Sequence, residues 1–114
     1  MKWLVNRVGH PFPFPKYYQV ASSEVGGAME NISLVAWTDL ALMDADYHAE
    51  RGLEVDSTNI HEMTHSYFGD LLVIKHFEHA WLKESWATYM EYCWMDENVS
   101  REEAEFEMLQ NADR

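Results

Sequence analysis

The stretch His61-Glu62-Met63-Thr64-His65 decides how this sequence is interpreted. On an α-helix, residues four positions apart lie one above the other on the same face, so His61 and His65 can reach a single ion. Imidazole nitrogens are good ligands for Zn²⁺, which favours tetrahedral geometry. Glu62 directly follows the first histidine, where its carboxylate can take a proton from a water activated by the metal. The stretch therefore predicts a zinc site with its own general base.

A zinc ion held by two histidines needs a third protein ligand, and a catalytic site then keeps the fourth position open. Eighteen residues separate His65 from Glu84, which lies near the start of a second predicted helix. A helix, a connection and a returning helix can bring this carboxylate to the metal. His61, His65 and Glu84 together predict one Zn²⁺ in a hydrolytic site rather than a closed structural site. The remaining histidines lack this spacing, and we assign no metal role to His10, His48, His76 and His79.

The first half of the chain contains short elements. Residues 1–8 are expected to be the last turns of a helix, and three prolines over residues 11–15 force an extended path. Aromatic and β-branched residues predict strands at 17–21 and 33–37, and Gly26-Gly27 is expected to break the chain between them. The pattern from 38 to 55 is weak, and we interpret it as a loop with at most a helical turn.

Three helices are predicted in the second half. The first is expected to begin at an N-cap Ser57 or Thr58 and to run to about Phe68, with Gly69 as its terminator. A helix over 80–95 is predicted from apolar residues at steps of three and four, namely Leu82, Trp86, Tyr89, Met90 and Cys93. Ser100 followed by Glu103 fits a capping box that opens a third helix at 101–112.

Composition restricts the class of protein. The chain has 114 residues, 47% of them hydrophobic, and this length fits one globular domain. Its net charge of −12 argues against nucleic-acid binding, which needs a basic surface. The apolar runs are too short for a membrane span, and one cysteine, Cys93, excludes an intrachain disulfide. We expect Cys93 on a buried helix face.

These residues resemble the aminopeptidase N family of gluzincin zinc peptidases. That family combines the H-E-x-x-H motif, an eighteen-residue gap and a glutamate with an upstream G-x-M-E-N sequence. The upstream element is similar to Gly27-Ala28-Met29-Glu30-Asn31, and two further stretches resemble family segments, Pro11-Phe12-Pro13-Phe14-Pro15-Lys16-Tyr17 and Trp81-Leu82-Lys83-Glu84-Ser85-Trp86-Ala87-Thr88-Tyr89. The resemblance covers roughly residues 8–95. It implies an α+β fold, with residues 1–114 as part of a single thermolysin-like catalytic domain in which short N-terminal strands precede a bundle of helices.

The resemblance also implies roles for individual residues. His61, His65 and Glu84 would be the zinc ligands, Glu62 the general base, and Glu30 the group that binds the free α-amine of a peptide substrate. A carboxylate at a set distance from the metal can select a charged N-terminus by charge-assisted hydrogen bonding. The small residues Gly27 and Ala28, with Met29, would lie against the peptide, and Asn31 would brace the loop that positions Glu30. From its place one helical turn after Glu84, Thr88 is a candidate to hydrogen-bond a ligating imidazole; ordinary structural hydrogen bonding is the alternative for Thr88 and for Asn31. Without the zinc motif, Glu30 would be interpreted as a solvent-facing turn carboxylate.

The sequence departs from the family pattern in two respects. Lys83 replaces the usual Asn before the third ligand, and Ser85-Trp86 replaces Gly-Phe. The family also uses a tyrosine well downstream of that ligand, whereas only thirty residues follow Glu84 here. We therefore expect a segment of a larger catalytic domain that works with the remainder of a parent protein. A zinc aminopeptidase is the first interpretation; a thermolysin-like endopeptidase and a zinc-binding but catalytically incomplete scaffold remain alternatives.

Overall fold

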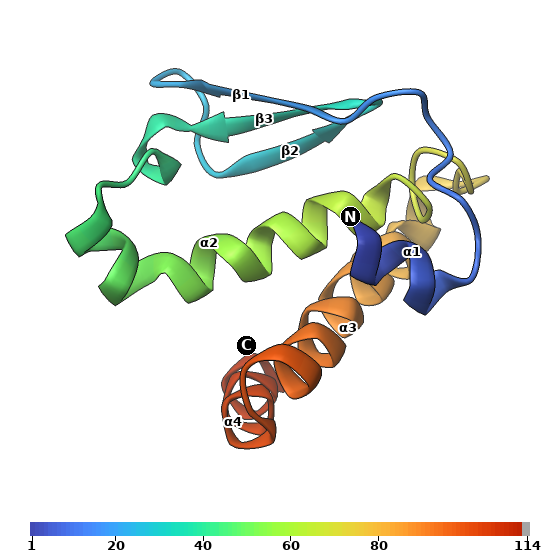
Figure 1. Ribbon diagram of the computed structural model, residues 1–114. Coiled ribbons are helices and arrows are strands. Elements are labelled where there is room, and N and C mark those ends of the chain that lie inside the picture. Colours follow the sequence, from blue (N-terminus) through green and yellow to red (C-terminus); the bar gives the residue numbers. More distant parts are fainter. Residues whose placement is uncertain (113–114) are drawn as a thin grey trace.

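A small sheet lies along a long helix, and two further helices pack beyond it (Figure 1). The structure is a computed structural model, and it describes residues 1–112. In chain order the elements are α1 (Lys2–Val8), β1 (Tyr18–Ser22), β2 (Ala28–Asn31), β3 (Leu34–Thr38), the 3₁₀ turn η1 (Asp39–Ala41), α2 (Ala45–His65), the 3₁₀ turn η2 (Phe77–His79), α3 (Ala80–Asn98) and α4 (Arg101–Ala112). This arrangement confirms the expected α+β fold.

The sheet has the strand order β1-β3-β2. β1 is parallel to β3, and β2 is antiparallel to β3, with Glu30 opposite Val35. Strands were predicted at 17–21 and 33–37, and β1 and β3 each begin one residue later. β2 was not predicted, because its four residues follow two glycines and include Glu and Asn, which are rare in strands. Pairing with β3 supplies the hydrogen bonds that its own sequence does not predict.

The predicted start of the long helix was wrong. α2 begins at Ala45, where Asp44 accepts a hydrogen bond from the Tyr47 amide at 2.9 Å as the N-cap. The first turns are exposed almost throughout, so they carry no apolar stripe that would indicate a helix. Ser57 and Thr58 lie inside α2 instead of capping it. The regular helix ends at His65, three residues before the predicted end.

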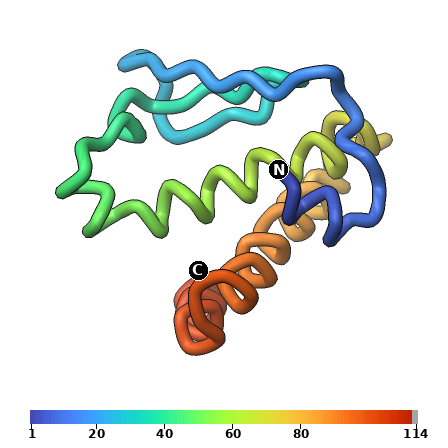
Figure 2. Tube along the Cα trace, in the orientation of Figure 1, coloured from blue at the N-terminus to red at the C-terminus, as the bar shows by residue number. Residues whose placement is uncertain are grey.

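The core lies where α1, α2 and α3 meet, and it joins segments far apart in sequence (Figure 2). Its buried members are Leu4, Ile60, Met63, Tyr67 and Met90. The predicted apolar face of α3 was only partly right, since Met90 is buried but Leu82, Trp86 and Tyr89 are exposed. Ala87 and Met95 are the other buried residues of α3, because its crossing with α2, and not its apolar pattern, decides which side is covered. Cys93 was expected on a buried helix face, but it is only half-buried.

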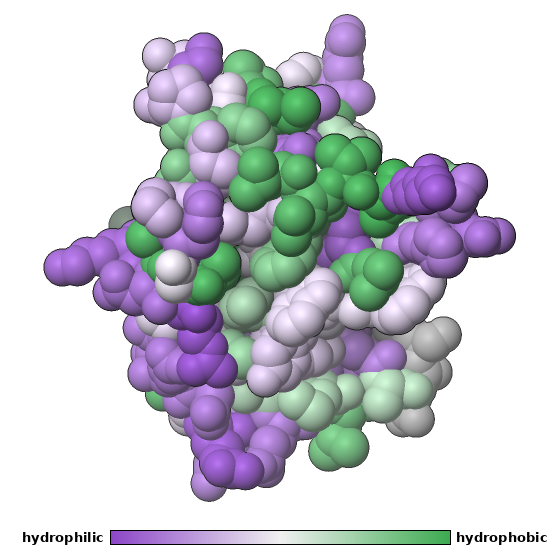
Figure 3. Space-filling model, turned by 90° about the vertical axis from the view of Figure 1, so that its right-hand side faces the viewer, coloured by the Kyte–Doolittle hydropathy of each residue, from purple (hydrophilic) through white to green (hydrophobic). Residues whose placement is uncertain are grey.

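The third predicted helix is confirmed, since α4 spans Arg101–Ala112 and Ser100 Oγ accepts a hydrogen bond from the Glu103 amide at 3.1 Å. Apolar side chains gather on the side of the molecule shown in Figure 3. In the segment that joins α2 to α3 and in the first turn of α3, exposed apolar residues include Leu72, Val73, Phe77 and Trp81. No helix among residues 1–112 is both long and apolar enough to cross a membrane.

Candidate metal centre

Three side chains converge at the C-terminal end of α2 and the start of α3. One ligand atom from each of His61, His65 and Glu84 lies within 4.8 Å of the others. Glu84 Oε2 lies 3.3 Å from His61 Nε2 and 3.4 Å from His65 Nε2. The two rings are edge to face, with centroids 4.8 Å apart. The last turns of α2 place both rings on one face, and α3 returns past them to bring the carboxylate.

Glu62 is buried beside this cluster. Burial raises the pKa of Glu62 to about 7, with a further increase from the negative charges of Glu30 and Glu84, while His61 opposes it. Its Oε2 atom is buried and has no hydrogen-bond partner within residues 1–112. Buried carboxylate oxygens normally have partners, so this oxygen is an acceptor for which residues 1–112 supply no donor. A carboxyl with a pKa near neutrality can both accept and donate a proton.

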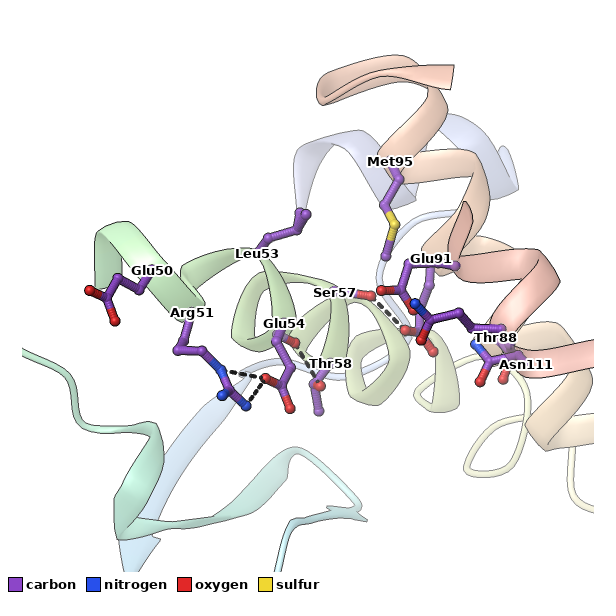
Figure 4. Close-up of a pocket in the computed structure, with 12 residues that line it drawn as sticks. Glu50, Arg51, Leu53, Glu54, Ser57, Thr58, Thr88, Glu91, Met95 and Asn111 are labelled. Carbon is purple, nitrogen blue, oxygen red and sulfur yellow. Dashed lines mark hydrogen bonds and ion pairs between the residues drawn. The ribbon is translucent and has the colours of Figure 1, made fainter. Parts of the chain in front are cut away.

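Glu91 holds the first histidine in place. Its Oε1 lies 2.6 Å from His61 Nδ1, and its Oε2 accepts a hydrogen bond from Ser57 Oγ at 2.5 Å. Burial alone would lower the pKa of His61, but the hydrogen bond and the charge of Glu91 outweigh it and raise that pKa. Figure 4 shows Ser57 and Glu91 meeting across α2 and α3, at the edge of a cavity of about 490 Å³. Neither histidine lines that cavity.

The second histidine is oriented by the backbone. His65 Nδ1 lies 3.1 Å from the carbonyl oxygen of Phe68, and burial lowers the pKa of His65, which favours the neutral ring that binds metals. Thr88 was expected to bond one imidazole, but both Nδ1 atoms have other partners and that expectation was wrong. The sequence does contain a signal for Glu91, because it follows Glu84 by seven residues and therefore shares its helix face.

Glu91→Gln is expected to weaken zinc binding by about tenfold to a hundredfold, the range found when a partner of a ligating histidine is removed. The neutral amide makes His61 less basic and no longer fixes its tautomer. The dissociation constant would be measured by competition with a chromophoric chelator. Glu102→Gln, an exposed change on α4, is the matched control. Equal zinc affinity in both variants would show that Glu91 does not support the metal site.

The upstream motif lies in and just before β2, on the sheet edge nearest α2. Its residues alternate in burial, with Ala28 and Glu30 on the more covered face and Met29 and Asn31 on the exposed face. Asn31 Nδ2 donates to the Met29 carbonyl at 3.4 Å. The structure therefore brings Glu30 towards the metal-ligand cluster and separates it from Met29 and Asn31. Gly27, with φ 95°, adopts the left-handed backbone conformation that glycine tolerates best.

Lys83 joins Glu30 to the cluster. Its Nζ donates one hydrogen bond to Glu30 Oε1 and another to Glu84 Oε1, the latter at 2.6 Å. Burial would raise the pKa of both carboxyls, but Lys83 outweighs it and holds the pKa of Glu30 and of Glu84 below the usual value. Both acids are thus ionised at neutral pH.

The residues present fit a zinc ion. Two imidazole Nε2 atoms and one carboxylate oxygen are the donor set of hydrolytic zinc sites, and both rings have the outer partners that ligating histidines usually show. Beside them, Glu62 Oε2 is a buried acceptor without a partner among the residues that the structure describes.

Comparison with known proteins gives the family. The model of the peptidase family M1 domain matches residues 1–114. The chain is 35% identical over 85 residues to Aminopeptidase M1 of Arabidopsis thaliana, covering 72% of this chain and 10% of that protein. It is 36% identical over 90 residues to Tricorn protease-interacting factor F2 of Thermoplasma volcanium, covering 77% of this chain and 12% of the relative.

A third relative, Probable aminopeptidase 1 of Sulfurisphaera tokodaii, is 34% identical over 84 residues, which are 72% of this chain and 11% of that protein. The chain thus spans about a tenth of the length of these curated relatives. Since the family model matches the whole chain, and the resemblance carried by the two motifs agrees with it, the protein belongs to peptidase family M1.

Proposed function

We propose that this chain is the metal-binding and proton-transferring core of a zinc aminopeptidase, which removes residues from peptides with a free N-terminus. The observation that carries the proposal is the convergence of His61, His65 and Glu84 beside a buried, partnerless Glu62 oxygen. The names of the relatives from Arabidopsis and Sulfurisphaera support the choice of an aminopeptidase. In this proposal residues 1–114 are part of a single thermolysin-like catalytic domain, which the remainder of a parent protein completes.

The roles of the residues follow from their environment. His61, His65 and Glu84 would hold one Zn²⁺, which supplies a Lewis acid when bound. Glu62, with a pKa of about 7, would take a proton from water and pass it to the departing amine. Glu30, which is ionised, would bind the α-ammonium group of the substrate and so align the first peptide bond with the metal ligands.

Two substrates that differ only at the N-terminus test this function. We expect an aminoacyl fluorogenic amide to be hydrolysed by the zinc-loaded protein, and its N-acetylated form to be cleaved more slowly. Equal or faster cleavage of the acetylated form would instead indicate a thermolysin-like endopeptidase. Bound zinc without cleavage of either substrate by the 114-residue chain, but with cleavage once longer parent sequence is added, would identify this chain as a core that other segments complete.

Glu30→Gln is expected to lower kcat/KM for the free-amine substrate by about tenfold, since a charge-assisted hydrogen bond is replaced by a neutral one. Cleavage of the N-acetylated substrate should stay unchanged, because that substrate has no ammonium group. Glu24→Gln, an exposed change in the turn before β2, controls for the loss of one negative charge. If Glu30→Gln slowed both substrates equally, the amine-binding role of Glu30 would be wrong.

A further inference from the structure

Lys83 connects the two carboxylates that the proposed reaction needs for different purposes. It lies in the first turn of α3, directly before Glu84. Its Nζ donates to Glu30 Oε1 on β2 and to Glu84 Oε1, while the other oxygen of Glu84 faces the imidazoles at 3.3 and 3.4 Å. One ammonium group therefore bridges the proposed amine-binding acid and the third ligand.

The Lys83–Glu30 half of the bridge is largely shielded from solvent, whereas the side chain of Glu84 is 49% exposed. The side chains of Lys83 and Glu30 are only 22% and 19% exposed, so their attraction is screened less than that of a surface pair. The stem of Lys83 passes close to Gly69, where an added Cβ would lie 3.4 Å from Lys83 Cδ. The backbone at Gly69 thus lies beside the stem, without a side chain to press against it.

Negative charge is concentrated around this ammonium. Glu30, Glu62 and Glu84 all carry carboxylates close enough to influence one another, and Asp70 also interacts with Glu30 and Lys83. Burial, followed by the charge of Glu30, raises the pKa of Asp70 to about 6. Lys83 is the cation that acts on each of these four acids, so it cancels part of a field that would otherwise attract other cations.

We propose that Lys83 is a specificity-determining residue that competes with the substrate ammonium for Glu30 and draws charge from Glu84 through the carboxylate oxygen that does not face the imidazoles. The inference rests on the proposed function, because it takes Glu30 as the acid that binds the N-terminus. An arriving ammonium finds Glu30 already paired with a cation of the protein, so the net gain from binding it is smaller than at an unpaired carboxylate. Lys83 thereby weakens the selection for a free N-terminus.

Zinc affinity tests the first half of the proposal without any substrate. Lys83→Met keeps most of the apolar stem and removes the charge. We expect the full chain with this change to bind zinc about tenfold more tightly in a chelator competition, because Glu84 no longer shares its charge. Lys75→Met is the control, since Lys75 and Lys83 both line an apolar cavity beside α3 but Lys75 is exposed. Unchanged affinity in Lys83→Met, with native circular dichroism, would overturn the proposal.

Selection of the ammonium tests the second half. Calorimetry on the zinc-loaded chain would compare leucine hydroxamate with N-acetyl-leucine hydroxamate. The dissociation constant of the acetylated compound divided by that of the free-amine compound measures the preference for a free amine. We expect Lys83→Met to raise this ratio about tenfold and Lys75→Met to leave it unchanged. A ratio that falls in Glu30→Gln but does not change in Lys83→Met would overturn the inference and leave the proposed function intact. A ratio that neither variant changes would overturn the amine-binding role of Glu30, and the inference with it.

Discussion

In the full-length parent enzyme, Glu62→Gln is expected to lower kcat by about a thousandfold while zinc stays bound, because general acid–base catalysis contributes on the order of 10² to 10⁴ in rate. The amide has nearly the shape of the carboxylate but cannot accept the proton of water. Glu62 contacts neither histidine through a hydrogen bond within residues 1–112, so the ligand set should be preserved. Turnover of the aminoacyl substrate and zinc content by atomic absorption would be measured on the same samples.

The metal-free chain offers a second measurement on this variant. The folded-state pKa of Glu62 is raised to about 7, so its contribution to stability is present below about pH 4.5 and is lost as the pH rises through 7. Glu62→Gln removes this titration, and the variant should therefore be at least as stable as the wild type at pH 8. Glu50→Gln, an exposed change on the same helix, controls for the loss of charge. Near-normal turnover in Glu62→Gln would contradict the role assigned to it.

Loss of one ligand is expected to abolish zinc-dependent stabilisation. Zinc at a hundred times its dissociation constant should stabilise the wild-type chain by about 2.7 kcal/mol. His65→Ala should weaken binding by roughly 10²-fold to 10⁴-fold, if binding free energies of about 10–16 kcal/mol are shared among three ligands. The midpoint of thermal unfolding, measured with and without zinc, reports the difference. His65 is only 1% exposed, so its removal also leaves a cavity that destabilises the metal-free chain.

Glu84→Gln separates the loss of a zinc ligand from the loss of packing in the core. The Glu84 side chain is 49% exposed, so its substitution leaves the core intact and acts mainly through the metal. We expect it to lose most of the zinc-induced shift in unfolding temperature, whereas His48→Ala, an exposed histidine on α2, should keep the full shift. A full shift in Glu84→Gln would show that this carboxylate is not a ligand, and the zinc-peptidase interpretation would then lose its third donor.

Helix spacing explains why the cluster of His61, His65 and Glu84 was predictable. The four-residue step from His61 to His65 has only one geometric outcome on a helix, and Glu84 needed only a returning helix to reach them. The hydrogen-bond partner of His61, Glu91, depends instead on how α2 and α3 cross. Ser57 was interpreted as an N-cap because its sequence context favours one, yet the crossing of α2 and α3 turns its hydroxyl towards Glu91.

Local sequence also determined α4, because the hydrogen bond between Ser100 and Glu103 is formed within one turn. Local sequence did not determine β2, which is a strand because β3 supplies its backbone partners. It also did not determine the exposed beginning of α2, where no buried face exists to produce a periodic pattern.

The sequence by itself determined the H-E-x-x-H spacing, the convergence of His61, His65 and Glu84, and the family, because each depends on residue types at regular positions along the chain. Only the tertiary structure decided that Glu91 and the Phe68 carbonyl orient the two imidazoles and that Lys83 bridges Glu30 and Glu84. These contacts join residues from different elements, and the separation and angle between packed elements follow from the whole core rather than from any local pattern.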